Sequence, residues 1–189
     1  MISLITDFDL SILDFIQSHM KCEFLDKVLR PITHLGDAGI FWILLGLVFM
    51  FSIKTRKMGL QVLASMALGY MIGNLILKNV IARERPYTIN TNIVLLIKEQ
   101  LDYSFPSGHT LASFNAAITI FFYRKSWGIA ALVLASIIAF SRMYLYVHFP
   151  TDILGAILLA MFVTFTIRGI FTRFVPDRIS FRRRPRNNT

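Results

Sequence analysis

The stretch SRMYLYVHFPTD, residues 141–152, joins two long apolar segments of this 189-residue chain. Helices are expected over about 127–148 and 151–172, so the polar residues of the stretch lie where one helix ends and the next begins. Both segments are long enough to cross a bilayer, which requires about 20 mainly apolar residues. Charged residues beside such segments are costly unless they have a partner or a function. The stretch therefore predicts an all-α membrane protein with a polar site at one helix junction.

The same stretch contains a histidine and an aspartate four residues apart, His148 and Asp152. At this spacing the carboxylate can accept a hydrogen bond from one ring nitrogen, which fixes the tautomer and leaves the other nitrogen as a nucleophile. The alternative is a structural pair that stabilises a turn. That alternative does not explain why Arg142 lies nearby.

Composition also favours a membrane protein. Hydrophobic residues make up 55% of the chain and charged residues 16%, with a mean hydropathy of +0.59, whereas soluble domains carry about 25% charged residues. The net charge of +9 is concentrated in seven arginines within 168–186. A one-sided excess of this kind favours membrane orientation over nucleic-acid binding. The single cysteine, Cys22, excludes an internal disulfide.

Three regions are expected along the chain. Residues 1–37 form an amphipathic leader, in which Ile5, Phe8, Ile12, Phe15 and Ile16 recur at helical spacing with acidic residues opposite; it predicts an interfacial helix, followed by a second over about 22–35. Residues 38–175 form a bundle of five to six helices, and 176–189 a basic tail. The five predicted crossings are roughly 38–54, 58–80, 107–123, 127–148 and 151–172.

The basic loops predict the orientation. Residues 54–57, the pair Arg124-Lys125 and the tail are rich in lysine and arginine, so the positive-inside rule places them in the cytoplasm. The connection 81–106 and the turn at 149–150 then lie outside, in a multi-pass protein of the plasma membrane. The outer connection also contains the basic residues Arg83, Arg85 and Lys98, which the rule would place in the cytoplasm. Their outer position therefore indicates a functional role.

Two further polar groups lie on the same predicted outer side. Lys78 ends the helix 58–80, and Arg85-Pro86 follow seven residues later. Arginine can bind phosphate oxygens bidentately and lysine adds a point charge, although for Lys78 taken alone snorkelling toward headgroups is the favoured explanation. Pro106-Ser107-Gly108-His109 begins the next helix, where free N–H groups and the helix dipole favour an anion. The alternative to an anion site is an ordinary capped helix in which His109 is exposed to water.

Together the motifs carry a resemblance. Lys78-x6-Arg85-Pro86, Pro106-Ser107-Gly108-His109 and Ser141-Arg142-x5-His148-x3-Asp152 match, in order and spacing, the three signature motifs of the type 2 phosphatidic acid phosphatase (PAP2) superfamily. The chain thus resembles that superfamily over residues 78–152 by motif and over the flanking helices by hydropathy. One departure is Tyr146, where a small residue is expected and where we expect the side chain to shape the pocket mouth.

The resemblance implies a PAP2-like membrane phosphohydrolase that uses no metal or other cofactor. By that resemblance, His148 attacks phosphorus and becomes a phosphohistidine, Asp152 orients it, and His109 is the general acid for the leaving group. The implied phosphate ligands are Lys78, Arg85, Ser107, Gly108 and Arg142. The expected partner is a membrane lipid substrate: polyprenyl pyrophosphate, phosphatidylglycerol phosphate or phosphatidic acid.

Three alternatives are weighed against this hypothesis. Vanadium haloperoxidases share the residue set but are typically soluble. A lipid phosphotransferase would use an acceptor other than water. A transporter or membrane scaffold would place ionisable residues in the middle of its spans, whereas here they cluster at helix ends.

Overall fold

The structure, a computed structural model, describes residues 2–175, and all the regular secondary structure within that range is helical. The predicted all-α architecture is confirmed; the basic tail predicted at 176–189 lies outside the described residues. The elements are α1 (Ile2–His19), α2 (Glu23–His34), η1 (Asp37–Gly39), α3 (Ile40–Phe51), α4 (Arg56–Tyr70), η2 (Met71–Leu77), α5 (Lys78–Ile81), α6 (Pro86–Ile89), α7 (Gly108–Tyr123), α8 (Lys125–Tyr144) and α9 (Pro150–Phe174).

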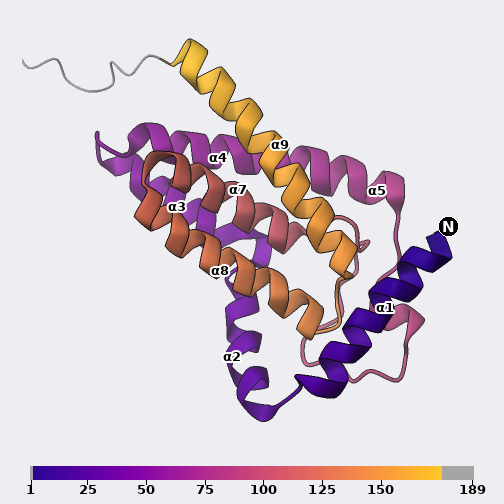
Figure 1. The fold of residues 1–189 in the computed structure, drawn as a ribbon. Coiled ribbons are helices and arrows are strands. Elements are labelled where there is room, and N and C mark those ends of the chain that lie inside the picture. The colour runs from indigo at the N-terminus through magenta and orange to yellow at the C-terminus, as the bar shows by residue number, and fades with distance from the viewer. Residues whose placement is uncertain (1, 176–189) are drawn as a thin grey trace, which may run out of the picture.

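Helix α7 occupies the centre of the bundle, in contact with α3, α4, α8 and α9 (Figure 1). Small residues are common among the buried positions of α7 and α8, with Ala116 and Ala117 of α7 and Ala135 of α8 fully buried in the core. Small side chains let helix backbones approach closely, which is how helices associate where lipid provides no hydrophobic driving force. The core therefore depends on close backbone contact around α7.

Fewer helices are long and apolar enough to cross a membrane than the five crossings that the sequence predicted. Within residues 2–175, three segments are long and apolar enough, Arg56–Ile89, Lys125–Tyr144 and Pro150–Phe174, with a fourth if the pair Glu23–His34 and Asp37–Phe51, bent by 45°, is one crossing. Two of the five predicted crossings are short by this measure. Helix α3 has 12 residues and is separated from α2 by η1, and α7 has 16 residues.

Helix α8 ends four residues earlier than predicted. Tyr146 has a positive φ of 59°, so the chain leaves the helix after Tyr144 although Leu145, Tyr146 and Val147 are all apolar. The carbonyl of Arg142 accepts hydrogen bonds from the N–H groups of Val147 (3.1 Å) and His148 (3.3 Å). This turn brings His148 back beneath the end of its own helix.

The leader is part of the folded unit. Helix α1 contacts α8 and α9, and α2 contacts α8. In α1 the buried side is formed by Asp9, Leu13 and Ile16, while Phe8 and Phe15 are exposed. The sequence predicted that the acidic residues would lie opposite the apolar face; Asp9 instead faces the bundle, because it binds Arg83 there.

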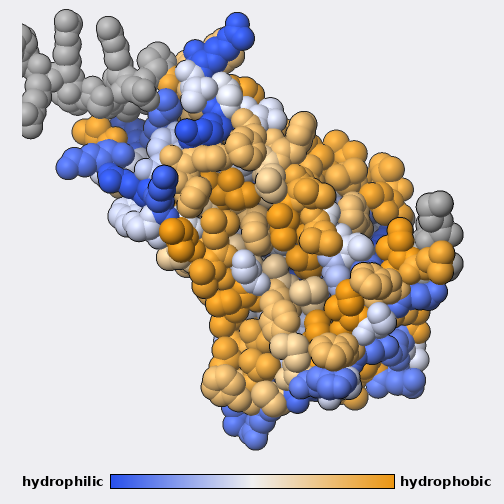
Figure 2. Space-filling model, in the orientation of Figure 1, coloured by the Kyte–Doolittle hydropathy of each residue, from blue (hydrophilic) through white to orange (hydrophobic). Residues whose placement is uncertain are grey.

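The surface has the pattern of a membrane protein. Figure 2 shows a broad hydrophobic band between two hydrophilic ends. On α9 the side chains of Leu154, Leu158, Phe162 and Phe165 are all more than half exposed. At one hydrophilic end, Lys57 donates a hydrogen bond to the carbonyl of Val175 (2.8 Å), which joins the basic turn after α3 to the end of α9.

The tightest helix contact generates a stability prediction. A Cβ at Gly128 would lie 2.1 Å from Cα of Phe121, whereas a Cβ at Gly169 meets nothing within 4 Å. Gly128→Ala should therefore destabilise the protein by about 1–3 kcal/mol, because backbone cannot move aside cheaply. Thermal unfolding in detergent measures this, with Gly169→Ala as the matched control. Equal midpoints for the two variants would contradict the close α7–α8 contact.

Candidate active site

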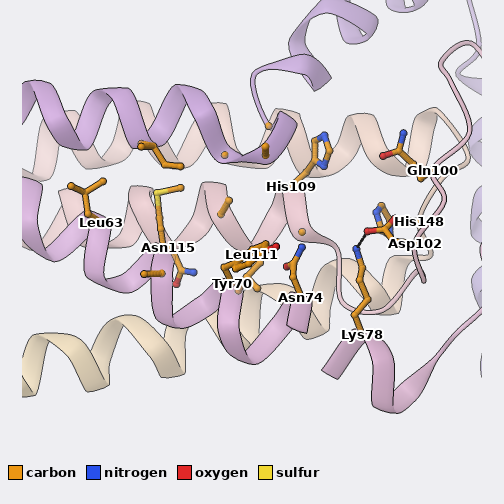
Figure 3. A pocket seen from close by; sticks show the side chains of 18 of the residues that line it. Leu63, Tyr70, Asn74, Lys78, Gln100, Asp102, His109, Leu111, Asn115 and His148 are labelled. Carbon is orange, nitrogen blue, oxygen red and sulfur yellow. Dashed lines mark hydrogen bonds and ion pairs between the residues drawn. The ribbon is translucent and has the colours of Figure 1, made fainter. Parts of the chain in front are cut away.

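The three polar motifs converge on one cavity of about 710 Å³. One end of it is lined by Lys78, Arg85, His109 and His148. Mainly apolar residues of α3, α4 and α7 line the rest, together with Asn74 and Asn115 (Figure 3). The cavity is thus polar at the loop end of the bundle and apolar between the helices. This shape suits a molecule with an anionic headgroup and a hydrocarbon tail.

His148 is buried, and its two ring nitrogens have different surroundings. Nδ1 lies 3.4 Å from Oδ2 of Asp152 and Nε2 lies 3.3 Å from Nη1 of Arg85. A guanidinium can only donate, so Nε2 carries the lone pair and Nδ1 the proton. Burial, followed by the positive charges of Arg85, Arg142 and Lys78, holds the pKa of His148 well below its ordinary value. The side chain is therefore a neutral imidazole that lines the cavity, and its Nε2 lone pair accepts a hydrogen bond from Arg85.

Three groups that the sequence analysis did not select hold the Asp152 carboxylate. The Ser104 hydroxyl and the Phe149 N–H (2.9 Å) donate to Oδ2. Nη1 of Arg83 donates to Oδ1 (2.7 Å), and Nη2 of the same residue pairs with Asp9 of α1 at 2.7 Å. In the sequence, Arg83 was notable only as a positive charge that the positive-inside rule would not place outside. Its two ion pairs provide the reason for its position.

The predicted cationic cradle is assembled around His148. Lys78 ends the wide turn of η2 and begins α5, Arg85 precedes α6, and Arg142 lies in the last turn of α8; all three are buried. Nη1 of Arg142 donates to Thr33 of α2 (2.8 Å), whereas its Nε and Nη2 are buried without a hydrogen-bond partner among the described residues. Buried unpaired guanidinium groups are costly, so these two donor atoms are available to a bound anion.

An internal carboxylate already occupies part of the cradle. Asp102 contacts Nζ of Lys78 (Figure 3), and its Oδ1 lies 2.6 Å from Nη2 of Arg85. Burial raises the pKa of Asp102, but the hydrogen bond from Lys78 and the charge of Arg85 outweigh that effect and lower it to about 2. Asp102 is therefore an anion at all ordinary pH values. The sequence analysis did not single it out.

The start of α7 provides the remaining predicted residues. Ser107 is the N-cap, and its hydroxyl accepts hydrogen bonds from the backbone N–H (3.5 Å) and the hydroxyl (3.0 Å) of Thr110. Gly108 and His109 line the cavity, and Nε2 of His109 lies 2.8 Å from Oδ1 of Asp37. The roles of Ser107 and Gly108 as phosphate ligands stay predictions.

Tyr146 does not line the pocket as expected. It is fully buried, and its hydroxyl donates to Asp14 of α1 (2.6 Å). Its left-handed backbone explains why a small residue is expected there, since a non-glycine residue in this region is strained by about 1–3 kcal/mol. Burial and the hydrogen bond to α1 offset that strain.

Comparisons with known proteins agree with this geometry. The PAP2 superfamily model matches residues 58–176. An undecaprenyl-diphosphatase from Sulfolobus acidocaldarius is 30% identical over 125 residues, covering 66% of this chain and 60% of that protein. Phosphatidylglycerophosphatase B from Bacillus subtilis is 32% identical over 160 residues, covering 77% of this chain and 75% of that protein.

Solved structures give the same result for the fold. A transmembrane PAP2 type phosphatidylglycerolphosphate phosphatase from Bacillus subtilis has a TM-score of 0.73 at 28% identity, covering 90% of this chain and 88% of its own. LpxE from Aquifex aeolicus has a TM-score of 0.68 at 24% identity, covering 85% of this chain and 94% of its own, and supports the fold alone.

The chain belongs to the PAP2 superfamily. Within it, the site and the relatives define the class as a membrane lipid phosphatase that hydrolyses phosphoric monoesters or diphosphates.

The position of Asp102 generates a binding prediction. A phosphate must displace this carboxylate from Lys78 and Arg85, so removing its charge should strengthen binding of free phosphate. Asp102→Asn should lower the inhibition constant of orthophosphate by roughly tenfold, since a larger fraction of the protein has an open cradle. Glu99→Gln, an exposed acid in the same loop, is the control. Unchanged or weaker inhibition by phosphate in Asp102→Asn would contradict competition by the carboxylate.

Proposed function

We propose that the protein hydrolyses the phosphomonoester or diphosphate of a membrane lipid through a phosphohistidine on Nε2 of His148. The observation that carries this proposal is the group of three buried cations around that nitrogen, of which Arg142 leaves two donor atoms without a partner among the described residues. Phosphoryl transfer depends mainly on positioning and on compensation of the charge on the equatorial oxygens. Lys78, Arg85 and Arg142 provide that compensation.

The reaction proceeds in two steps. In the first, Nε2 of His148 forms an N–P bond while the P–O bond to the lipid breaks, and His109 gives a proton to the departing oxygen. In the second, water attacks phosphorus and gives a proton to His109 as the N–P bond breaks, which releases phosphate and restores both histidines. Asp152 holds the Nδ1 proton of His148 and stabilises the positive charge that develops on the ring.

Residues of the protein perform every step of this scheme, so we propose that no metal is required. The positive charges that a metal ion would contribute in other phosphoryl-transfer sites come here from the lysine and the two arginines. Hydrolysis should therefore continue in EDTA.

The cavity supports a lipid as the substrate. From the cradle it extends between α3, α4 and α7, where Ile43, Leu63 and Met66 give it an apolar wall. The names of the relatives supply the candidate class, since they act on undecaprenyl diphosphate and phosphatidylglycerol phosphate. We propose a polyprenyl diphosphate, phosphatidylglycerol phosphate or phosphatidic acid as the substrate.

We further propose that the active site faces the outside of the plasma membrane. The basic turn at 54–57, the pair Arg124-Lys125 and Arg173 lie at helix ends remote from the cradle, and the hydrogen bond from Lys57 to Val175 ties two of these ends together. By the positive-inside rule this end is cytoplasmic.

Catalysis is tested by phosphate release from the three lipid classes in detergent with EDTA. His148→Ala should abolish release because no phosphohistidine can form, and His109→Ala should lower it by about 10²–10⁴-fold on lipid substrates. Both variants should unfold at temperatures near that of the unchanged protein.

Two results would count against the mechanism: full activity in His148→Ala, or strict dependence on added Mg²⁺. Product analysis with an added alcohol acceptor separates hydrolysis from phosphotransfer to that acceptor. His19→Gln is the control, because His19 is exposed at the end of α1 and contacts only its own helix.

Orientation is tested with the natural cysteine. Cys22 is exposed, and its N–H donates to the hydroxyl of Tyr144 (3.2 Å) at the active-site end of α8. A membrane-impermeant maleimide should therefore label Cys22 in intact cells. In a Cys22→Ser background, Ser52→Cys at the opposite end should be labelled only after the cells are lysed. The reverse pattern would overturn the proposed orientation.

A further inference from the structure

We infer that Asp37, supported by His34, is a positioning residue that orients His109 as the proton donor of the reaction. The inference rests on the proposed function and adds to it the residue that acts through the general acid. Asp37 belongs to none of the three motifs. It lies in η1, 72 positions before its partner on α7.

Two hydrogen bonds define the arrangement. Oδ1 of Asp37 lies 2.8 Å from Nε2 of His109, and Oδ2 lies 2.7 Å from Nδ1 of His34. A carboxylate can only accept, so each of these ring nitrogens carries a proton. The proton on Nε2 is hydrogen-bonded to Asp37. Nδ1 of His109 is then the ring nitrogen that can exchange a proton with the substrate.

The backbone around Asp37 is shaped to the ring of His109. A Cβ at Gly36 would lie 2.5 Å from Cδ2 of that ring, so only glycine allows this approach. The two residues after Asp37 are both left-handed, with φ of 49° at Ala38 and 66° at Gly39. A left-handed alanine is strained, and such strain clusters at functional sites. The turn between α2 and α3 thus holds the imidazole by contact and by hydrogen bond.

Stability alone does not account for this arrangement. The Asp37 side chain is 52% exposed and that of His34 is 58% exposed, and exposed ion pairs contribute only about 0–1 kcal/mol. The His109 side chain, by contrast, is 13% exposed and lines the cavity. Asp37 therefore connects a ring inside the cavity with a ring in solvent.

This geometry assigns a path to the proton. Burial lowers the pKa of His109 to about 4, and the hydrogen bond and charge of Asp37 oppose that shift, so Asp37 favours the charged ring that can act as an acid. As the P–O bond to the lipid breaks, Nδ1–H of this charged ring gives its proton to the departing alkoxide, and the neutral ring keeps its Nε2 proton hydrogen-bonded to Asp37. In the second step Nδ1 accepts a proton from the attacking water. Asp37 stabilises the charged ring at the start of the first step and at the end of the second.

The test compares two substrates that differ in their need for a proton donor. Dodecyl phosphate releases an alkoxide, which requires protonation, whereas 4-nitrophenyl phosphate releases a stable phenolate, which does not. The parameter is kcat/KM, which reports the steps up to the phosphohistidine. Asp37→Asn should lower it by about 10²-fold for dodecyl phosphate and leave it nearly unchanged for 4-nitrophenyl phosphate. His34→Gln should show the same selectivity with a smaller loss.

Matched controls separate positioning from folding. Glu23→Gln, an exposed acid at the start of α2, and His19→Gln should leave both substrates unaffected. An equal loss for both substrates in Asp37→Asn, or no loss for either, would overturn the inference. If Asp37→Asn does not fold, His34→Gln decides alone, because Asp37 stays in place. No hydrolysis of either substrate by the unchanged protein would instead refute the proposed function.

Discussion

The mutual repulsion of three buried cations dominates this structure. Lys78, Arg85 and Arg142 converge on one imidazole in a region from which water is largely excluded, and such a group is unstable without compensating negative charge. Asp102 supplies part of that charge through Lys78 and Arg85. Arg142 has no such partner among residues 2–175 and keeps two donor atoms unpaired. One carboxylate therefore compensates part of this charge, and the unpaired Arg142 donors are the ones that the proposed mechanism assigns to a phosphate.

The same constraint explains why the leader packs where it does. Side chains of residues 1–37 bind members of each polar motif region: Asp9 holds Arg83, Thr33 holds Arg142, and Asp37 holds His109. A leader that only lay on the membrane surface would make none of these contacts. The first two helices are thus as much part of the site as the helices that carry the motifs.

The sequence predicted the all-α fold and the convergence of the motif residues on one cavity, because helices and motifs both have local signals. Apolar runs located the helices, and fixed spacing located His148, Asp152 and the cations. The pairing of Asp37 with His109 joins residues 72 positions apart, and that of Asp9 with Arg83 joins residues 74 apart. No local pattern marks such partners. The early end of α8 has a related cause. Residues 145–147 are apolar, so hydropathy does not distinguish the left-handed turn at Tyr146 from a continuing helix.

The pairing of Asp102 with the cradle bears on the design of inhibitors. A phosphate mimic must carry enough charge to displace that carboxylate, and such charged compounds cross membranes poorly. In the proposed binding mode, a neutral molecule that fills the apolar end of the cavity, beside Leu63 and Met66, would leave the ion pairs closed and still exclude the lipid tail. Because Asp102 already pairs with Lys78 and Arg85, the apolar end of the cavity is the easier end for an inhibitor to occupy.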